Sequence, residues 1–184
     1  MRTLKLEGGF ARLDAMEARL CVPCNEVAQI PAVRDFFRLV SRLGDGMAWY
    51  SLLLILPVTF GGGALLPVAS MAITALAGVV IYKILKETLV RERPFASHFQ
   101  VKPVSRPLDR YSFPSGHTMH AAAFLTQLAS YFPAVMWLML PFGIAVAMSR
   151  VVLGLHYPSD VLAGALLGWV LAAISLSLLP ALLV

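Results

Sequence analysis

Long apolar stretches alternate with charged segments along this chain. No Asp, Glu, Lys or Arg occurs in residues 46–82, in residues 111–149 or in residues 161–184. A helix needs about 20 apolar residues to cross a bilayer, so the first two stretches can each hold a pair of crossing helices and the third can hold one. The pattern therefore predicts an all-α protein, a polytopic transmembrane helical bundle.

Helix breakers divide the two longer stretches where a helix pair needs a turn. Gly61, Gly62 and Gly63 interrupt the first stretch, and Pro133 interrupts the second. We expect five spans, at residues 47–60, 64–82, 116–132, 134–151 and 159–179.

The first 45 residues follow a different pattern, in which apolar positions at helical spacing alternate with charges. One such stripe is formed by Val33, Phe36, Phe37, Val40 and Leu43, and a weaker one by Phe10, Leu13, Met16 and Leu20. Pro23 and Pro31 are expected to break the helices, and Gly44 to cap the second one. We predict amphipathic helices in residues 1–45 that lie on the membrane or pack on the bundle, with a sixth span left open. Residues 46–184 are the expected transmembrane domain.

Composition and charge agree with a membrane protein. The chain is 59% hydrophobic and 14% charged, whereas soluble domains average about 45–50% and about 25%. The net charge of +5 suits an acidic partner, and beside apolar helices an anionic lipid headgroup explains it better than nucleic acid does. Cys21 and Cys24 form a lone CxxC pair, for which incidental thiols are favoured over a zinc or redox site.

Placing an ionisable side chain in or beside a membrane span costs free energy, so such residues are candidates for a functional role. They form three groups: Lys86 with Arg93 and Pro94; Pro114, Ser115, Gly116 and His117; and Ser149 and Arg150 with His156 and Asp160. Counting the predicted crossings places all three groups on one side of the membrane. We therefore expect them to form one cluster.

The chemistry of the cluster suits a phosphate group. Lys86, Arg93 and Arg150 supply three positive charges, two of them guanidinium groups that can bind phosphate oxygens in pairs. Ser115 and Gly116 lie where a helix begins, so their backbone N–H groups can also face an anion.

Two histidines and a carboxylate can divide the reaction between them. Asp160, four residues after His156, can accept a hydrogen bond from one ring nitrogen and leave the other as a nucleophile. His117 can protonate the leaving oxygen and then deprotonate water. This scheme requires no metal and no cofactor, and the nearby acidic residues Glu87, Glu92 and Asp109 do not form a metal cage in the sequence.

Other polar residues receive simpler interpretations. The cations expected to be solvated or to contact headgroups are Lys83, Arg91, Lys102, Arg106 and Arg110. His120 either faces the site or makes a polar contact inside the bundle. Gly164 and Gly168 form a GxxxG pattern that indicates close helix packing.

Together the three groups resemble the three-part signature of the type 2 phosphatidic acid phosphatases, a family of integral-membrane lipid phosphatases. The signature positions are Lys86, Arg93, Pro94, Pro114, Ser115, Gly116, His117, Ser149, Arg150, His156 and Asp160. The resemblance covers residues 46–184. It implies a phosphohistidine intermediate on His156 and acid and base catalysis by His117, with phosphate bound by Lys86, Arg93, Ser115, Gly116 and Arg150. Relatives usually have six spans, one more than the five expected here.

The favoured hypothesis is hydrolysis of a lipid phosphate or diphosphate, with undecaprenyl diphosphate as substrate. The alternatives are phosphatidylglycerophosphate and phosphatidate. Vanadium haloperoxidases resemble the family in their site but are soluble and larger, and a non-catalytic lipid-binding or lipid-transfer protein would not need both histidines and Asp160.

The sequence also bears on the membrane that holds the protein and on the side of that membrane where the site lies. We expect a bacterial inner-membrane protein whose site lies on the periplasmic face, as is common in the family. The positive-inside rule points the other way, because Lys and Arg concentrate on the site's side. Several of these cations are required by the chemistry, however. The sequence predicts no oligomeric state.

Overall fold

The computed structural model describes residues 10–105 and 109–178, and these residues form helices and loops with no β-strand among them. This confirms the all-α prediction. The helices are α1 (Ala11–Val27), α2 (Pro31–Arg42), a π-helical turn η1 (Leu43–Met47), α3 (Ala48–Phe60), a short 3₁₀ turn η2 (Gly61–Ala64), α4 (Leu65–Leu89), α5 (Pro94–Ser97), α6 (Gly116–Tyr131), α7 (Pro133–Val152) and α8 (Pro158–Leu178).

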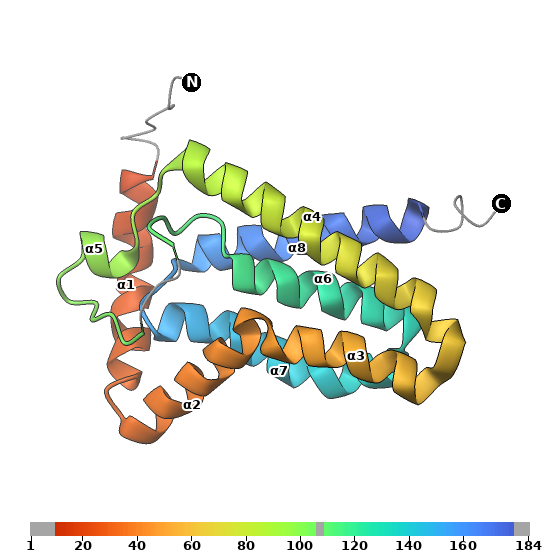
Figure 1. Ribbon diagram of the computed structural model, residues 1–184. Coiled ribbons are helices and arrows are strands. Elements are labelled where there is room, and N and C mark those ends of the chain that lie inside the picture. The colour runs from red at the N-terminus through yellow and green to blue at the C-terminus, as the bar shows by residue number, and fades with distance from the viewer. Residues whose placement is uncertain (1–9, 106–108, 179–184) are drawn as a thin grey trace.

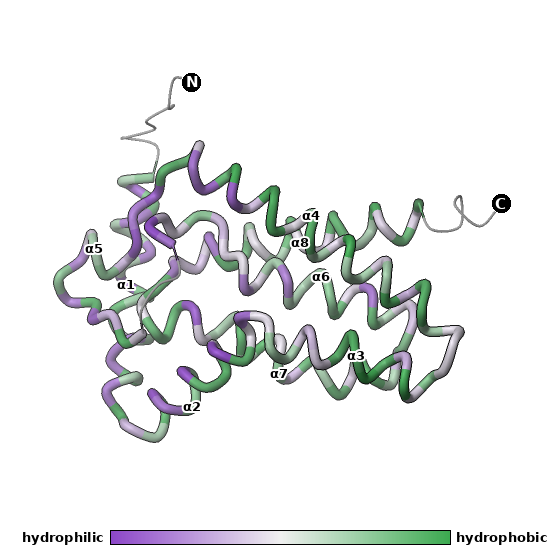
Figure 2. The backbone as a smooth tube through the Cα atoms, in the orientation of Figure 1, coloured by the Kyte–Doolittle hydropathy of each residue, from purple (hydrophilic) through white to green (hydrophobic). Residues whose placement is uncertain are grey.

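Five helices, α3, α4, α6, α7 and α8, form an elongated bundle, and α1 lies across one end of it (Figure 1). The short helix α5 and the loops beside it lie at the same end, and α2 connects α1 to α3. Hydrophilic residues gather at this end, whereas the rest of the bundle is mostly apolar (Figure 2). We call it the polar end.

The outer surface of the bundle is apolar, as a lipid-facing surface must be. Side chains such as Val58, Leu138 and Leu162 are 87%, 77% and 70% exposed. Three helical segments of the described residues are long and apolar enough to cross a membrane, namely the joined run Pro31–Ser97, Pro133–Val152 and Pro158–Leu178. Helices α3 and α6 have only 13 and 16 residues, so the count of five spans stays a prediction.

Helices α6 and α8 pack closely because α8 presents small residues to α6. A Cβ atom at Gly164 would collide with the carbonyl group of Ser115, and one at Gly168 with that of Met119. The packing role predicted for this GxxxG pair is confirmed. Deeper in the bundle, the Gln127 amide donates hydrogen bonds to the hydroxyl groups of Ser70, Thr74 and Ser175, which joins α6 to α4 and α8.

The N-terminal helices differ in detail from the expectation. Pro31 begins α2 as predicted, but Pro23 lies inside α1 and does not end it. Gly44 does not cap α2 either, because η1 carries the helix onward into α3. The predicted last residue of the fifth span, Leu179, lies outside the described residues, and a domain boundary at residue 45 stays a prediction.

Candidate functional site

The three predicted cations are brought together at the polar end of the bundle. Lys86 comes from the last turn of α4, Arg93 from the segment that leads into α5, and Arg150 from the last turn of α7. All three are at least 94% buried and line one cavity. The convergence predicted by counting crossings is therefore observed.

Each cation is held in place by a hydrogen bond. The Lys86 ammonium donates to the Asp109 carboxylate at 2.6 Å, and Arg93 donates to the carbonyl oxygens of Asp109 and Leu155 at 2.9 and 2.7 Å. Burial lowers the pKa of Arg93 to about 10, so its guanidinium is still charged at neutral pH. Arg150 donates to the hydroxyl group of Ser41 on α2.

Helix α6 begins at the site, as the sequence predicted. Ser115 is its N-cap and accepts a hydrogen bond from the backbone N–H of Thr118, and Gly116 lines the cavity. The expectation that the Ser115 N–H faces an anion is wrong, because this group donates to the carbonyl of Asp160 at 3.0 Å. Gly116 is the residue of this pair whose backbone reaches the cavity.

His156 lies in the loop between α7 and α8 and is 1% exposed. Its Nε2 atom is 3.4 Å from Nη1 of Arg93, and its Nδ1 atom is 3.7 Å from the Asp160 carboxylate, which is longer than a hydrogen bond. Burial and the charges of Arg150 and Arg93 hold the pKa of His156 well below its usual range. The imidazole is therefore neutral at physiological pH, as a nucleophile must be.

Asp160 accepts hydrogen bonds from the backbone N–H of Tyr157 and from Arg91, a residue expected from the sequence to be solvated or to contact headgroups. That expectation is wrong, because Arg91 is 1% exposed. Its guanidinium donates to the carboxylates of Asp160, Asp14 and Glu17, each at 2.6 Å. Its Cζ atom also lies 4.8 and 4.2 Å from the ring centres of Phe10 and Tyr157. Burial alone would lower the pKa of Arg91, but the carboxylates raise it above its ordinary value.

The other cations that were expected to be solvated or to contact headgroups are not buried where the structure describes them. Lys83, Lys102 and Arg110 are exposed, as expected, and Arg106 lies outside the described residues. The sequence carries no local signal for the role of Arg91. Its partners on α1 are 74 and 77 residues away in the chain, and no local pattern reveals them.

His117 lies in the first turn of α6, and its Nε2 atom contacts the carboxylate of Asp45 in η1. Nothing in the sequence pattern distinguishes Asp45 as a site residue. His120 combines both open alternatives: it lines the cavity, and its ring nitrogens lie 2.8 Å from the carbonyl of Gly116 and 3.2 Å from that of Ala75.

These residues surround a cavity of about 340 Å³ that is polar at one end and apolar along its walls. Lys86, Arg93, Arg150, His117 and His156 lie around the polar end. The apolar walls come mainly from α3 and α4, through Trp49, Tyr50, Leu53, Ala72, Ala75, Leu76 and Val79. The shape suits a molecule that has an anionic group and an apolar chain. No three His, Cys, Asp or Glu side chains of the described residues are grouped so as to hold a metal ion.

A family model described as the PAP2 superfamily matches residues 63–182, which include every signature position. The chain belongs to the PAP2 superfamily. Within this superfamily, the chain is 38% identical over 95 residues to a lipid A 1-phosphatase of Rhizobium etli, a match that covers 49% of this chain and 41% of that relative.

Two further proteins are similar to this chain over most of its length. An undecaprenyl-diphosphatase of Sulfolobus acidocaldarius is 29% identical over 176 residues, which are 91% of this chain and 80% of that protein. The crystal structure of Aquifex aeolicus LpxE superposes with a TM-score of 0.73 at 27% identity, covering 86% of this chain and 93% of the other. The similarity therefore extends beyond the signature to the N-terminal helices.

Proposed function

We propose that this protein is a membrane lipid phosphatase that forms a phosphohistidine intermediate on His156. The observation that carries the proposal is the buried imidazole of His156 among three cations, at the polar end of a cavity with apolar walls. A non-catalytic lipid-binding protein would need the cations but not a nucleophile with a carboxylate behind it.

In the first step the lone pair on Nε2 of His156 attacks phosphorus while the bond from phosphorus to the leaving oxygen breaks. His117 gives its proton to that oxygen. In the second step water attacks the phosphohistidine, the P–N bond breaks, and His117 takes the proton from the water. Phosphate leaves, and both histidines return to their starting states.

The three cations stabilise the charge that develops on the phosphoryl oxygens. A helix terminus contributes only about 0.3–1 kcal/mol at an exposed site, so Lys86, Arg93 and Arg150 supply most of the stabilisation, with Ser115 and Gly116 forming the start of α6 beside them. Asp160 faces Nδ1 of His156 and stabilises the positive charge that the ring acquires when Nε2 binds phosphorus.

The favoured substrate is undecaprenyl diphosphate. The apolar walls on α3 and α4 suit a polyprenyl chain, and a relative that covers most of this chain is named an undecaprenyl-diphosphatase. The local match to a lipid A 1-phosphatase supports a second candidate, the 1-phosphate of lipid A. Phosphatidylglycerophosphate and phosphatidate are the two remaining candidate substrates.

The test is phosphate release by the purified protein in detergent across these four lipids. We expect undecaprenyl diphosphate to give the highest kcat/KM. We expect His156→Ala to lower the rate by at least about 10³-fold, as removal of a nucleophile does in other enzymes, and vanadate to inhibit. His98→Gln is the matched control, because His98 lies outside the cavity lining. Full activity in His156→Ala would exclude the phosphohistidine, and lipid binding without phosphate release would favour the non-catalytic alternative.

We also propose that the polar end faces the periplasm from a bacterial inner membrane. Four of the positive charges at this end are explained by the site: Lys86, Arg93 and Arg150 line the cavity, and Arg91 holds Asp160. These cations therefore say little about orientation.

A further inference from the structure

Asp45 lies in a turn whose backbone places it against the site. The π-helical turn η1 joins α2 to α3, and such turns are rare and often found at functional sites. Gly46 has φ = 143°, which L side chains rarely adopt, and a Cβ atom there would lie 2.7 Å from the Tyr50 ring. At Gly44 a Cβ atom would lie 3.0 Å from Val146. Gly44 therefore lets the turn pack closely beside α7, and Gly46 lets it pack beside Tyr50 of α3.

The turn brings the Asp45 carboxylate into contact with Nε2 of His117. The His117 side chain is 9% exposed, and among the described residues Asp45 is the only carboxylate that contacts it. Asp45 lines the cavity together with His117 and His156. One turn earlier on the same helical run, Ser41 binds Arg150. The N-terminal segment therefore contributes directly to the site.

Charge explains why a carboxylate is needed there. A general acid at His117 must carry a proton in a cavity that already holds the positive charges of Lys86, Arg93 and Arg150. A fourth positive charge is repelled by the other three unless an anion offsets it. Asp109 is hydrogen-bonded to Lys86 and Asp160 to Arg91, which leaves Asp45 as the carboxylate in contact with His117.

We propose that Asp45 is a positioning residue for the general acid, which keeps the proton on Nε2 of His117 and aims the ring at the leaving oxygen. When substrate binds, the N–H group at Nε2 of His117 turns from the Asp45 carboxylate to the leaving oxygen, and its proton passes from Nε2 to that oxygen as the P–O bond breaks. Asp45 remains ionised throughout. The inference rests on the proposed function, and it adds a residue that lies outside the three signature groups.

Leaving groups of different basicity separate this role from a structural one. An alkoxide, as released from phosphatidate, needs a proton in order to leave, whereas nitrophenolate leaves without one. Loss of the general acid's partner must therefore slow hydrolysis of phosphatidate much more than hydrolysis of p-nitrophenyl phosphate. A merely structural defect slows both substrates alike.

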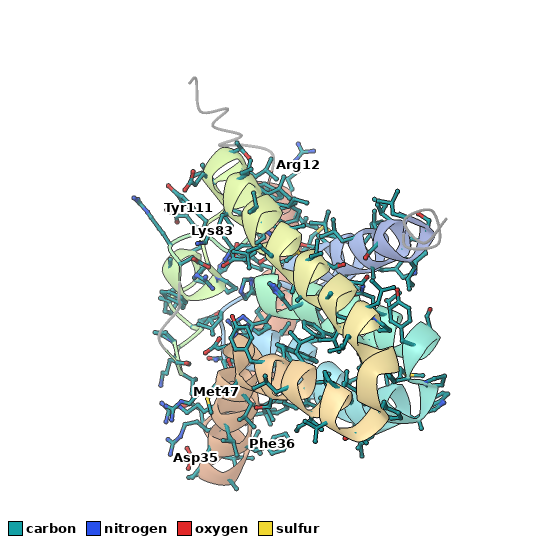
Figure 3. The ribbon with its side chains drawn as sticks, turned by 45° about the vertical axis from the view of Figure 1, so that its right-hand side comes forward. Arg12, Asp35, Phe36, Met47, Lys83 and Tyr111 are labelled. Carbon is teal, nitrogen blue, oxygen red and sulfur yellow. The ribbon has the colours of Figure 1, made fainter. Side chains whose placement is uncertain are left out.

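The experiment compares kcat/KM of the wild type and Asp45→Asn on phosphatidate and on p-nitrophenyl phosphate. We expect the loss on phosphatidate to be about 10²-fold, the lower range of general acid catalysis, and at least tenfold greater than the loss on p-nitrophenyl phosphate. Asp45→Glu keeps the carboxylate and should restore part of the difference. Asp35→Asn is the matched control, because Asp35 lies at the outer end of α2 and its side chain is 64% exposed (Figure 3).

The outcomes are distinguishable. Equal losses on the two substrates, or no loss, would overturn the role of Asp45 while leaving the phosphatase proposal intact. A wild type that hydrolyses neither these substrates nor the other lipid phosphates would overturn the proposed function itself. If Asp45→Asn does not fold, the ratio of the two rates in Asp45→Ala, which also lacks the carboxylate, decides, since a ratio equal to that of the wild type contradicts the positioning role.

Discussion

At Arg91 a single guanidinium joins carboxylates from two helices that lie far apart in the chain. Asp14 and Glu17 come from α1, and Asp160 comes from α8. Glu17 also accepts hydrogen bonds from the backbone and the hydroxyl group of Ser159, at the start of α8. Because Asp160 faces His156, this network links the N-terminal helix to the proposed nucleophile.

Replacing Arg91 by Met would leave these three carboxylates without their shared partner. Breaking a buried ion pair costs about 3–5 kcal/mol, so we expect a clearly lower free energy of unfolding and a strong loss of phosphate release. Thermal unfolding in detergent measures the first and the lipid assay the second. Arg110→Met is the control, because Arg110 is exposed. Equal stability of Arg91→Met and Arg110→Met would contradict the network.

Residues inside the sequence motifs were largely predictable, whereas their partners were not. The motifs that contain Lys86, Arg93, Arg150 and His156 lie beside apolar stretches, and counting the predicted crossings places these motifs on one side of the membrane. Arg91 and Asp45 have no such signal, because a charge near a loop is usually solvated. Only the tertiary contacts with Asp14, Glu17 and His117 show that these two charges are part of the site.

Among the helices, α6 holds the bundle together through its contact with α8. The contact is close because Gly164 and Gly168 place no side chain against the α6 backbone. The sequence predicted this packing from the GxxxG pattern. It did not predict that α2 continues into α3, because glycines at residues 44 and 46 are typical of a helix end, and the π turn that they form instead depends on packing against Val146 and Tyr50.

A methyl group at Gly168 should therefore separate α6 from α8. Overpacking in a tight contact costs about 1–3 kcal/mol, so we expect Gly168→Ala to lower the thermal unfolding midpoint in detergent. Gly62→Ala is the matched control, because a Cβ atom at Gly62, in η2, would meet nothing within 4 Å. An unchanged midpoint in Gly168→Ala would show that the two helices can move apart without cost.

For the whole molecule, the polar end and the turn η2 mark opposite ends of the bundle (Figure 1). Gln100, in the loop after α5, is exposed at the polar end, and Gly62 is exposed in η2. If both helices on either side of η2 cross the bilayer, these two positions lie on opposite sides of it. Labelling them tests the orientation without reference to charge.

We expect a membrane-impermeant maleimide added outside spheroplasts to label Gln100→Cys, and to label Gly62→Cys only after lysis. The variants are made in a Cys24→Ser background. Cys21 needs no replacement, because burial raises the pKa of its thiol to about 12 and keeps it unreactive. The opposite labelling pattern would place the site in the cytoplasm and contradict the proposed orientation.

The hydrogen bonds between Glu17 and Ser159 also have a consequence for the order in which the protein folds. They join residues 142 positions apart, so Glu17, on the first described helix, cannot form them until the start of the last described helix has been made. Closing so long a loop is entropically unfavourable until the intervening helices are in place. The reactive centre is therefore completed only when α8 has been made. A nascent chain that stops before α8 lacks Asp160, the carboxylate beside the nucleophile, and Ser159, which donates hydrogen bonds to Glu17.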